Sequence, residues 1–199
     1  MCIRDRHDAM KNLLIVESPT KVKSIEKFLG KDFKVLASVG HVRDLMASSR
    51  KGINVDNNYE PVWKISKDKK DVMNEIKEAS KKADNVYFAT DPDREGEAIS
   101  KHIYEILDKA KILKGKKTYR VAFNEITKTA VSEAIENPRE ISDDLWNAYV
   151  ARRTLDYLMG YDISEFLWKK VSRLARGGRV QSPASVSYTH LTLPTILLV

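Results

Sequence analysis

Residues 86–97 read VYFATDPDREGE, an apolar run that passes directly into a segment rich in carboxylates. The apolar half, residues 86–89, has the length and the β-branched and aromatic content of a buried strand. After it, Asp91, Asp93 and Glu95 are spaced two residues apart, so in extended backbone their side chains project to the same side. Ligands of α/β sheets bind at the carboxyl ends of the strands. The stretch therefore predicts a strand that ends in a functional site.

The pattern of a strand followed by a helix recurs on both sides of this stretch. Strands are predicted at residues 13–16, 33–39 and 119–123. Helical spacing of apolar residues predicts helices at 19–30, 66–83, 98–107 and 127–135. Because strands alternate with helices, residues 11–137 are predicted to form an α/β parallel sheet flanked by helices.

The pattern changes in two places. Residues 46–63 are rich in Ser, Gly, Asn and Pro, which is typical of a loop. From Ile141 onward only helical spacing remains, first up to Leu158 and then, after Gly160, in a second amphipathic stretch around Trp168. A domain boundary is therefore predicted near residues 138–141.

A fourth carboxylate, Glu17, occupies the corresponding place after the first strand. Carboxylates brought together repel one another unless a cation lies between them, and hard oxygen ligands suit Mg²⁺. The alternative is a solvated acidic loop at a helix N-terminus, which attracts Asp and Glu. Lys21 and Arg94 lie where a phosphate would arrive, although ordinary surface ion pairs would also explain them. His41 follows a predicted strand end and is either functional or a satisfied structural group.

The stretch from residue 152 to 181 is basic. Seven Lys and Arg residues fall within 28 positions, together with Tyr157, Tyr161 and Trp168, and Gly177 and Gly178 allow close backbone approach. Clustered arginine with interleaved aromatic residues favours contact with a nucleic acid, and the alternative is a solvated helix face.

Composition excludes several classes. Of the 199 residues, 42% are hydrophobic and 32% charged, which excludes collagen-like and disordered chains. No run of 18 apolar residues and no secretory signal is found, so a cytoplasmic protein is expected. The single cysteine, Cys2, excludes an internal disulfide and a thiolate metal site.

Both ends differ from the body. Residues 1–9 show no periodicity and precede Met10, and the C-terminal tail after residue 185 carries no charge. We interpret residues 1–9 and 185–199 as a non-native leader and tail, which makes the natural chain longer than this one. The alternative for the tail is a genuine apolar strand.

Six segments together resemble the bacterial topoisomerase I family of type IA DNA topoisomerases. They are IVESPTK (15–21), GHVRDL (40–45), ATDPDREGEAI (89–99), FNEIT (123–127), NAYVARRTLDYLMGY (147–161) and GRVQS (178–182). The resemblance covers residues 11–184, and the first two segments favour topoisomerase I over topoisomerase III. It implies a Toprim domain with a Rossmann-like sheet at 10–138 and the truncated start of a helical DNA-binding domain at 139–184.

The resemblance also implies a function. Enzymes of this family relax negatively supercoiled DNA without ATP by cutting one strand through a 5′-phosphotyrosine, passing another strand and resealing. Matching positions imply catalytic roles for Glu17, Lys21 and Arg94, and a Mg²⁺ site formed by Glu17, Asp91, Asp93 and Glu95. The implied DNA path is lined by His41, Arg152, Arg153, Asp156, Tyr161, Trp168, Arg176, Gly177, Gly178, Arg179, Val180 and Gln181. DNA, single-stranded or negatively supercoiled, is the implied partner of a monomeric, nucleoid-associated enzyme that uses no nucleotide and no membrane.

Two departures from the family pattern matter. Residues 173–182 read RLARGGRVQS where the family commonly has RGLSAGRVQS, so the contacts of residues 174–177 differ. The catalytic tyrosine of the family lies in a Y-x-R-T-D motif, which no tyrosine of this chain matches. We therefore expect this chain alone not to cleave DNA. Two other interpretations are a stand-alone module that binds metal and single-stranded DNA, and a Toprim nuclease or primase.

Overall fold

The computed structural model describes residues 11–46, 51–173, 176–178 and 183–184. The predicted leader and the whole of the predicted tail lie outside these residues, as do Arg179, Val180 and Gln181. The described chain forms two compact units, one made of the residues up to Asp44 with 63–149, the other of 45–62 with the residues from Val150 onward.

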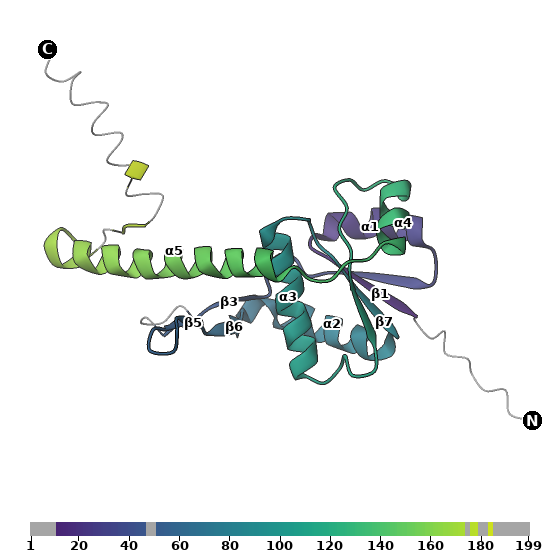
Figure 1. The fold of residues 1–199 in the computed structure, drawn as a ribbon, viewed down its shortest axis with the longest axis horizontal. Coiled ribbons are helices and arrows are strands. Elements are labelled where there is room, and N and C mark those ends of the chain that lie inside the picture. The colour runs from purple at the N-terminus through teal and green to yellow at the C-terminus, as the bar shows by residue number, and fades with distance from the viewer. Residues whose placement is uncertain (1–10, 47–50, 174–175, 179–182, 185–199) are drawn as a thin grey trace, which may run out of the picture. The chain divides into compact units, whose positions relative to one another are not determined.

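The first unit is built on a four-stranded, all-parallel sheet (Figure 1). Its strands are β1 (Asn12–Val16), β2 (Phe33–Ala37), β7 (Asn85–Ala89) and β8 (Lys117–Arg120). The strand order is β2-β1-β7-β8, so the first strand of the chain is central. This confirms the predicted α/β fold, and the central position explains why β1 is an unbroken apolar run.

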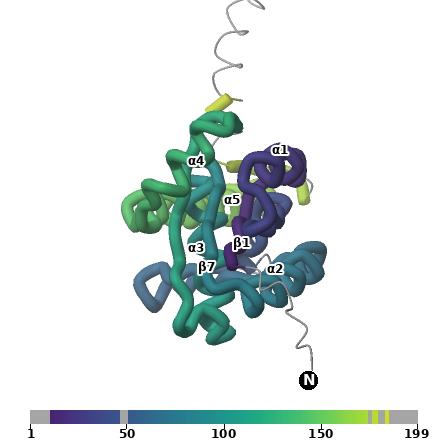
Figure 2. The backbone as a smooth tube through the Cα atoms, turned by 90° about the vertical axis from the view of Figure 1, so that its right-hand side faces the viewer, coloured from purple at the N-terminus to yellow at the C-terminus, as the bar shows by residue number. Residues whose placement is uncertain are grey.

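Helices cover both faces of this sheet. They are α1 (Pro19–Leu29), α2 (Lys70–Lys82), which follows a 3₁₀ turn (Lys67–Lys69), α3 (Arg94–Lys109) and α4 (Lys128–Glu136). In both views α1 and α4 lie on one face and α2 and α3 on the other (Figures 1 and 2). Three layers of this kind result when parallel strands are joined by helical crossovers.

Two apolar cores fill the space between these layers. Leu13 and Ile15 of β1 belong to the core on the α2 and α3 side, and Leu14 and Val16 to the core on the α1 and α4 side. All four side chains are fully buried. Because successive side chains of a strand point to opposite faces, β1 alone anchors both layers.

Several predicted strand and helix boundaries shift, and helix α3 begins at Arg94 instead of residue 98. Strand β2 ends at Ala37 instead of residue 39, because Val39 and Gly40 have positive φ angles of 57° and 81° that leave the extended region. Strand β8 lies at 117–120 instead of 119–123, although the Val121 amide still donates to the Phe88 carbonyl at 2.9 Å. Ser66 precedes the 3₁₀ turn and makes no side-chain cap.

The helical region after residue 141 is one helix, α5 (Asp143–Lys170), of 28 residues. The predicted second stretch after Gly160 is the continuation of this helix. Gly160 lies inside the helix, and a Cβ at this position would meet nothing within 4 Å. The change from alternating strands and helices to helix alone occurs after residue 139, whereas the two compact units divide inside α5, after Tyr149.

Short strands connect the sheet to α2. They are β3 (Arg43–Leu45), which pairs with β6 (Trp63–Ile65), and β4 (Ile53–Asn54), which pairs antiparallel with β5 (Glu60–Pro61). Within the second unit, the Tyr157 hydroxyl accepts from the Gly52 amide at 3.0 Å and donates to the Met46 carbonyl at 2.9 Å. Among the described residues, no helix is long and apolar enough to cross a membrane.

Candidate functional site

The carboxylates predicted as a metal site lie at the carboxyl ends of two neighbouring strands. We call Glu17, Asp91, Asp93 and Glu95 the acidic edge. Val16 is opposite Ala89 in the parallel register of β1 and β7, so the residues that follow the two strands leave the sheet side by side. Adjacent parallel strands thus bring together residues that are more than 70 positions apart in the sequence.

Two helices begin at the acidic edge. The Ser18 side chain accepts from the Thr20 amide and caps α1, and the Asp93 side chain accepts from the Gly96 amide at 2.7 Å and caps α3. Helix N-termini carry partial positive charge and unpaired amides, which suits an anion such as a phosphate. The predicted extended spacing of the three side chains is wrong, because the chain bends at residues 92 and 93 and Glu95 lies in the first turn of α3.

Among the described residues, each side chain of the acidic edge except that of Glu17 has a hydrogen-bond or ion-pair partner. The Lys21 ammonium forms an ion pair with Asp91, and His41 Nε2 lies 2.8 Å from Glu95 Oε2. His41 reaches this position because Gly40, with its positive φ angle, turns the chain while its amide donates to the Glu17 carbonyl at 3.1 Å. The sequence-predicted residues Glu17, Lys21 and His41 are therefore gathered at one edge.

The pKa of Glu17 is raised above its ordinary value of 4.5. Burial is the main cause and the negative charge of Asp91 the second, while the charge of Lys21 acts in the opposite direction. Asp93 also raises the pKa, and His41 lowers it. The pKa of Glu17 is therefore raised chiefly because the carboxyl group is buried, and repulsion from neighbouring carboxylates adds to that effect.

The donor set of the acidic edge fits a divalent cation. Hard carboxylate oxygens are preferred ligands of Mg²⁺. Burial first, and repulsion from Asp91 second, raise the pKa of Glu17, and a bound cation would act against both effects by stabilising the ionised carboxylate. Among the described residues, no three acidic, histidine or cysteine side chains are grouped closely enough to hold a metal ion. In this arrangement, Lys21, His41 and the N-cap of α3 engage three of the four carboxylates.

A cavity of about 320 Å³ opens beside the acidic edge. It is lined by Lys21, Asp91, Pro92 and Asp93 on one side and by Phe123, Asn124, Glu125 and Ile126, the FNEIT segment, on the other. Arg94, the first residue of α3, is exposed and makes no ion pair with the described residues, so its charge is available to a ligand.

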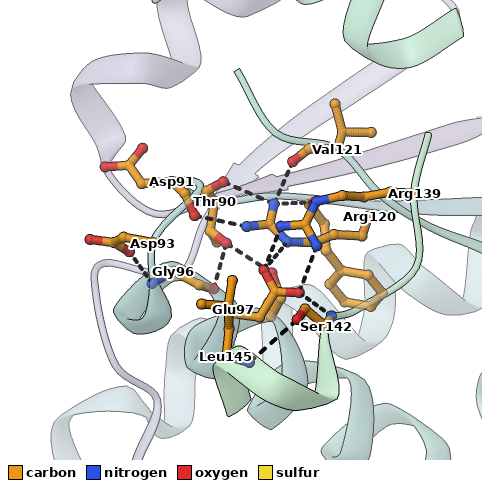
Figure 3. Close-up of polar contacts among 12 residues, drawn as sticks. Thr90, Asp91, Asp93, Gly96, Glu97, Arg120, Val121, Arg139, Ser142 and Leu145 are labelled. Carbon is orange, nitrogen blue, oxygen red and sulfur yellow. Dashed lines mark hydrogen bonds and ion pairs between the residues drawn. The ribbon is translucent and has the colours of Figure 1, made fainter. Parts of the chain in front are cut away.

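Behind the acidic edge lies a buried polar network that the sequence interpretation missed (Figure 3). Glu97 and Arg120 are both fully buried in side chain and pair at 3.1 Å. Arg139 adds two hydrogen bonds to the Glu97 carboxylate, at 3.0 and 2.7 Å. An arginine inside the apolar run YRVAF was the available signal, since a buried charge requires a partner.

The second unit contains a separate cavity, of about 360 Å³, which we call the α5 pocket. It is lined by Asp156, Tyr157, Gly160, Tyr161, Ser164, Trp168 and Arg176. Four residues of the predicted DNA path, namely Asp156, Tyr161, Trp168 and Arg176, are thus brought together, and the rings of Tyr157 and Tyr161 lie 4.7 Å apart. Burial and the Tyr157 hydroxyl raise the pKa of Tyr161, so it stays a neutral phenol.

The other described residues of the predicted DNA path do not line the α5 pocket. Ser164 Oγ accepts from the Gly177 amide at 3.2 Å, and a Cβ at Gly177 would collide with Ile163, so only glycine fits there. Arg152 and Arg153 lie on α5 but do not line the pocket, and Gly178 follows Gly177. Arg152 lies 3.9 Å from Asp156.

Comparisons with known proteins agree on one relationship. The Toprim domain family matches residues 12–126. Two strains of Xylella fastidiosa have a protein named DNA topoisomerase 1 that is 52% identical over 174 residues, which is 87% of this chain and 21% of theirs. The structure of full-length topoisomerase I from Thermotoga maritima superposes with a TM-score of 0.73 at 37% identity, covering 83% of this chain and 27% of that one. The chain therefore spans about a fifth of the length of the curated relatives it matches.

Proposed function

Because this chain belongs to the Toprim domain family, we propose that it is the Toprim-containing part of a type IA DNA topoisomerase, which relaxes negatively supercoiled DNA. The observation that carries the proposal is the acidic edge. Four carboxylates, Lys21 and two helix N-termini meet at the ends of β1 and β7, which is an arrangement suited to a divalent cation and a phosphodiester.

Toprim domains bind divalent metals, and we propose Mg²⁺ as the ion, held by Glu17, Asp91, Asp93 and Glu95. When bound, the ion supplies positive charge that stabilises the phosphate during cleavage and resealing. Lys21 and Arg94 neutralise the phosphate from the protein side. Glu17 is the residue that we assign to proton transfer at the 3′ oxygen, since it is the one carboxylate of the acidic edge whose side chain makes no hydrogen bond with the described residues.

The DNA strand is proposed to run along His41 and the α5 residues. Tyr161 and Trp168 offer flat faces on which bases stack, and Arg152, Arg153 and Arg176 pair with phosphates. The same role is proposed for Arg179 to Gln181, which lie outside the described residues. Asp156, at 3.9 Å from Arg152, orients an arginine or accepts from a base.

Cleavage itself needs a tyrosine hydroxyl that attacks the phosphodiester, forms a 5′-phosphotyrosine and releases a 3′ hydroxyl. The phosphotyrosine bond stores the energy for resealing, so no ATP is consumed. No tyrosine of this chain stands in a Y-x-R-T-D motif, and we propose that this chain alone is inactive. We further propose that the whole enzyme is a monomer that acts on DNA in the cytoplasm.

A chimera between this chain and one of its relatives tests the proposal. The 174 matched residues would replace the corresponding region of the Xylella fastidiosa DNA topoisomerase 1, and relaxation of a negatively supercoiled plasmid would be followed with Mg²⁺ present. We expect the chimera to relax DNA, and the same chimera carrying Asp91→Ala to lose most of that activity. The unchanged relative serves as the control.

Two results would overturn the proposal. One is a folded chimera that binds DNA and does not relax it. The other is Mg²⁺-dependent DNA cutting by this chain alone that Asp91→Ala abolishes, which would instead identify a Toprim nuclease.

A further inference from the structure

Glu97 is a carboxylate with no solvent exposure in the first turn of α3. Its two oxygens accept from Arg120, from both terminal nitrogens of Arg139 and from the Ser142 amide, the last at 2.6 Å. Two guanidinium groups and one amide surround the carboxylate, and all of them donate hydrogen bonds, so both oxygens of Glu97 act as acceptors in the ionised form. Glu97 therefore carries an ionised, fully paired carboxylate with no exposure to solvent. Its own contact with the acidic edge is through the backbone, where its amide donates to the Asp93 carbonyl at 2.9 Å.

Arg120 transmits the position of Glu97 to the acidic edge. Its guanidinium donates to the carbonyls of Thr90 at 2.9 Å and Asp91 at 2.8 Å, and also to those of Phe88 and Val121 (Figure 3). These carbonyls lie where β7 ends and its ladder of backbone hydrogen bonds stops. The planar fork of an arginine replaces that ladder and holds the backbone from which the Asp91 side chain projects.

The loop is held on its other side as well. The Thr90 hydroxyl donates to the Gly96 carbonyl at 2.6 Å, and the Gly96 amide donates to Asp93. A Cβ at Gly96 would lie 2.8 Å from the Asp91 nitrogen, so α3 and the loop are in direct backbone contact. Residues 90–96 are thus fixed between Arg120 and the start of α3.

We infer that Glu97 is a positioning residue for the acidic edge: through Arg120 it holds the backbone of Thr90 and Asp91 where the carboxylates can bind a divalent cation. The inference rests on the proposed function, because it assigns the metal site to these carboxylates. Glu97 touches neither metal nor substrate. Its negative charge is what keeps a buried guanidinium stable beside the loop.

The test compares Glu97→Gln with Glu105→Gln in this chain. Glu105 lies on the same helix and pairs with Arg43, away from the acidic edge, so its variant removes a matched carboxylate–arginine contact. Mn²⁺ replaces Mg²⁺ as the probe, and its affinity is measured by electron paramagnetic resonance at a temperature where both variants are folded. We expect Glu97→Gln to bind Mn²⁺ roughly 10- to 100-fold more weakly than the wild type and Glu105→Gln to bind it equally well.

Hydrogen exchange of the Gly96 amide supplies a readout that needs no metal. Since this amide donates to Asp93, we expect its exchange to accelerate in Glu97→Gln and to stay unchanged in Glu105→Gln. If Glu97→Gln does not fold, Arg120→Lys is measured in its place, because one ammonium keeps the charge beside Glu97 but cannot reach both the Thr90 and Asp91 carbonyls.

The outcomes separate the inference from the proposed function. A folded Glu97→Gln with wild-type Mn²⁺ affinity and wild-type exchange at Gly96 overturns the inference and leaves the proposed function standing. A wild-type chain that binds no Mn²⁺, with exchange at Gly96 still accelerated in Glu97→Gln, overturns the proposed metal site and supports the positioning of the loop.

Discussion

His102 on α3 is a buried histidine held in its neutral form. Its Nδ1 accepts from Arg43 Nε at 2.9 Å, so the ring proton is on Nε2. Trp63 and Trp146 meet the ring edge-on, with centroids at 4.5 and 5.0 Å. Burial, followed by the charges of Arg43 and His41, lowers the pKa of His102 from 6.5 to about 2. The imidazole therefore serves as an uncharged acceptor for Arg43.

This assignment predicts a pH dependence of stability. The unfolded chain binds a proton at His102 below pH 6.5 and the folded chain does not, so the free energy of unfolding falls as the pH decreases from 6.5. At about 1.4 kcal/mol for each pH unit, this residue costs roughly 3 kcal/mol by pH 4.5. Denaturant unfolding followed by tryptophan fluorescence measures the effect.

The matched variant is His102→Gln, which keeps a neutral acceptor for Arg43 and does not titrate. We expect its free energy of unfolding to change less between pH 6.5 and 4.5 than that of the wild type. Parallel curves for the two proteins would mean that His102 is protonated in the folded state.

At the scale of helices, two glycines have opposite roles. Gly96 packs against the backbone of Asp91 at the start of α3, whereas Gly160 lies inside α5 with open space around it. A methyl group at the first position has no room, and at the second it only restricts the backbone of the unfolded chain.

We predict that Gly96→Ala destabilises the first unit by roughly 1–3 kcal/mol, the cost of overpacking. Gly160→Ala is expected to stabilise α5 by up to about 1 kcal/mol, because alanine has the higher helix propensity. Thermal and chemical unfolding followed by circular dichroism measure both changes. If Gly96→Ala left the free energy of unfolding unchanged, the backbone of residues 90–96 would move without cost.

The same scale shows what the sequence could and could not predict. Strand β1 and helix α3 were predicted because local patterns specify them: an apolar run before Glu17, and buried positions at helical spacing. The four carboxylates of the acidic edge could be expected to lie together, because the carboxyl ends of parallel strands meet at the same edge of a sheet. The partnership of Arg120 with Glu97 could not be predicted, since 23 residues separate them and only the register of β8 against β7 brings them together. In the α5 pocket, by contrast, every lining residue except Arg176 lies on α5 itself, so local helical spacing accounts for most of that site.

At the scale of the whole molecule, basic residues outnumber acidic ones by 35 to 28, and the chain carries a net charge of +7. Lys81 on α2 is one of these basic residues, but its charge is balanced by the ion pair with Glu78. The α5 pocket, by contrast, combines Arg176 with aromatic rings. The proposed DNA binding should therefore depend on where the charges lie as well as on how many there are.

Salt titration of the binding of a fluorescent single-stranded oligonucleotide tests this. We expect the affinity to fall as salt rises, because phosphate contacts release counterions. Arg176→Ala should weaken binding and reduce the slope of log affinity against log salt by about 1, while Lys81→Ala leaves both unchanged. Equal effects of the two variants, or binding that salt does not change, would contradict a DNA path along α5.

The central place of β1 has a consequence for how the chain is made. A ribosome releases β1 first, but its neighbour β7 emerges about 70 residues later and the arginine of β8 later still. At translation speeds of about 5–20 residues per second, Asp91 emerges from the ribosome several seconds after Glu17, and Arg120 emerges later still. The nascent protein therefore cannot bring Glu17 and Asp91 together until β7 has left the exit tunnel, and the contact of Arg120 with the Asp91 carbonyl forms later still.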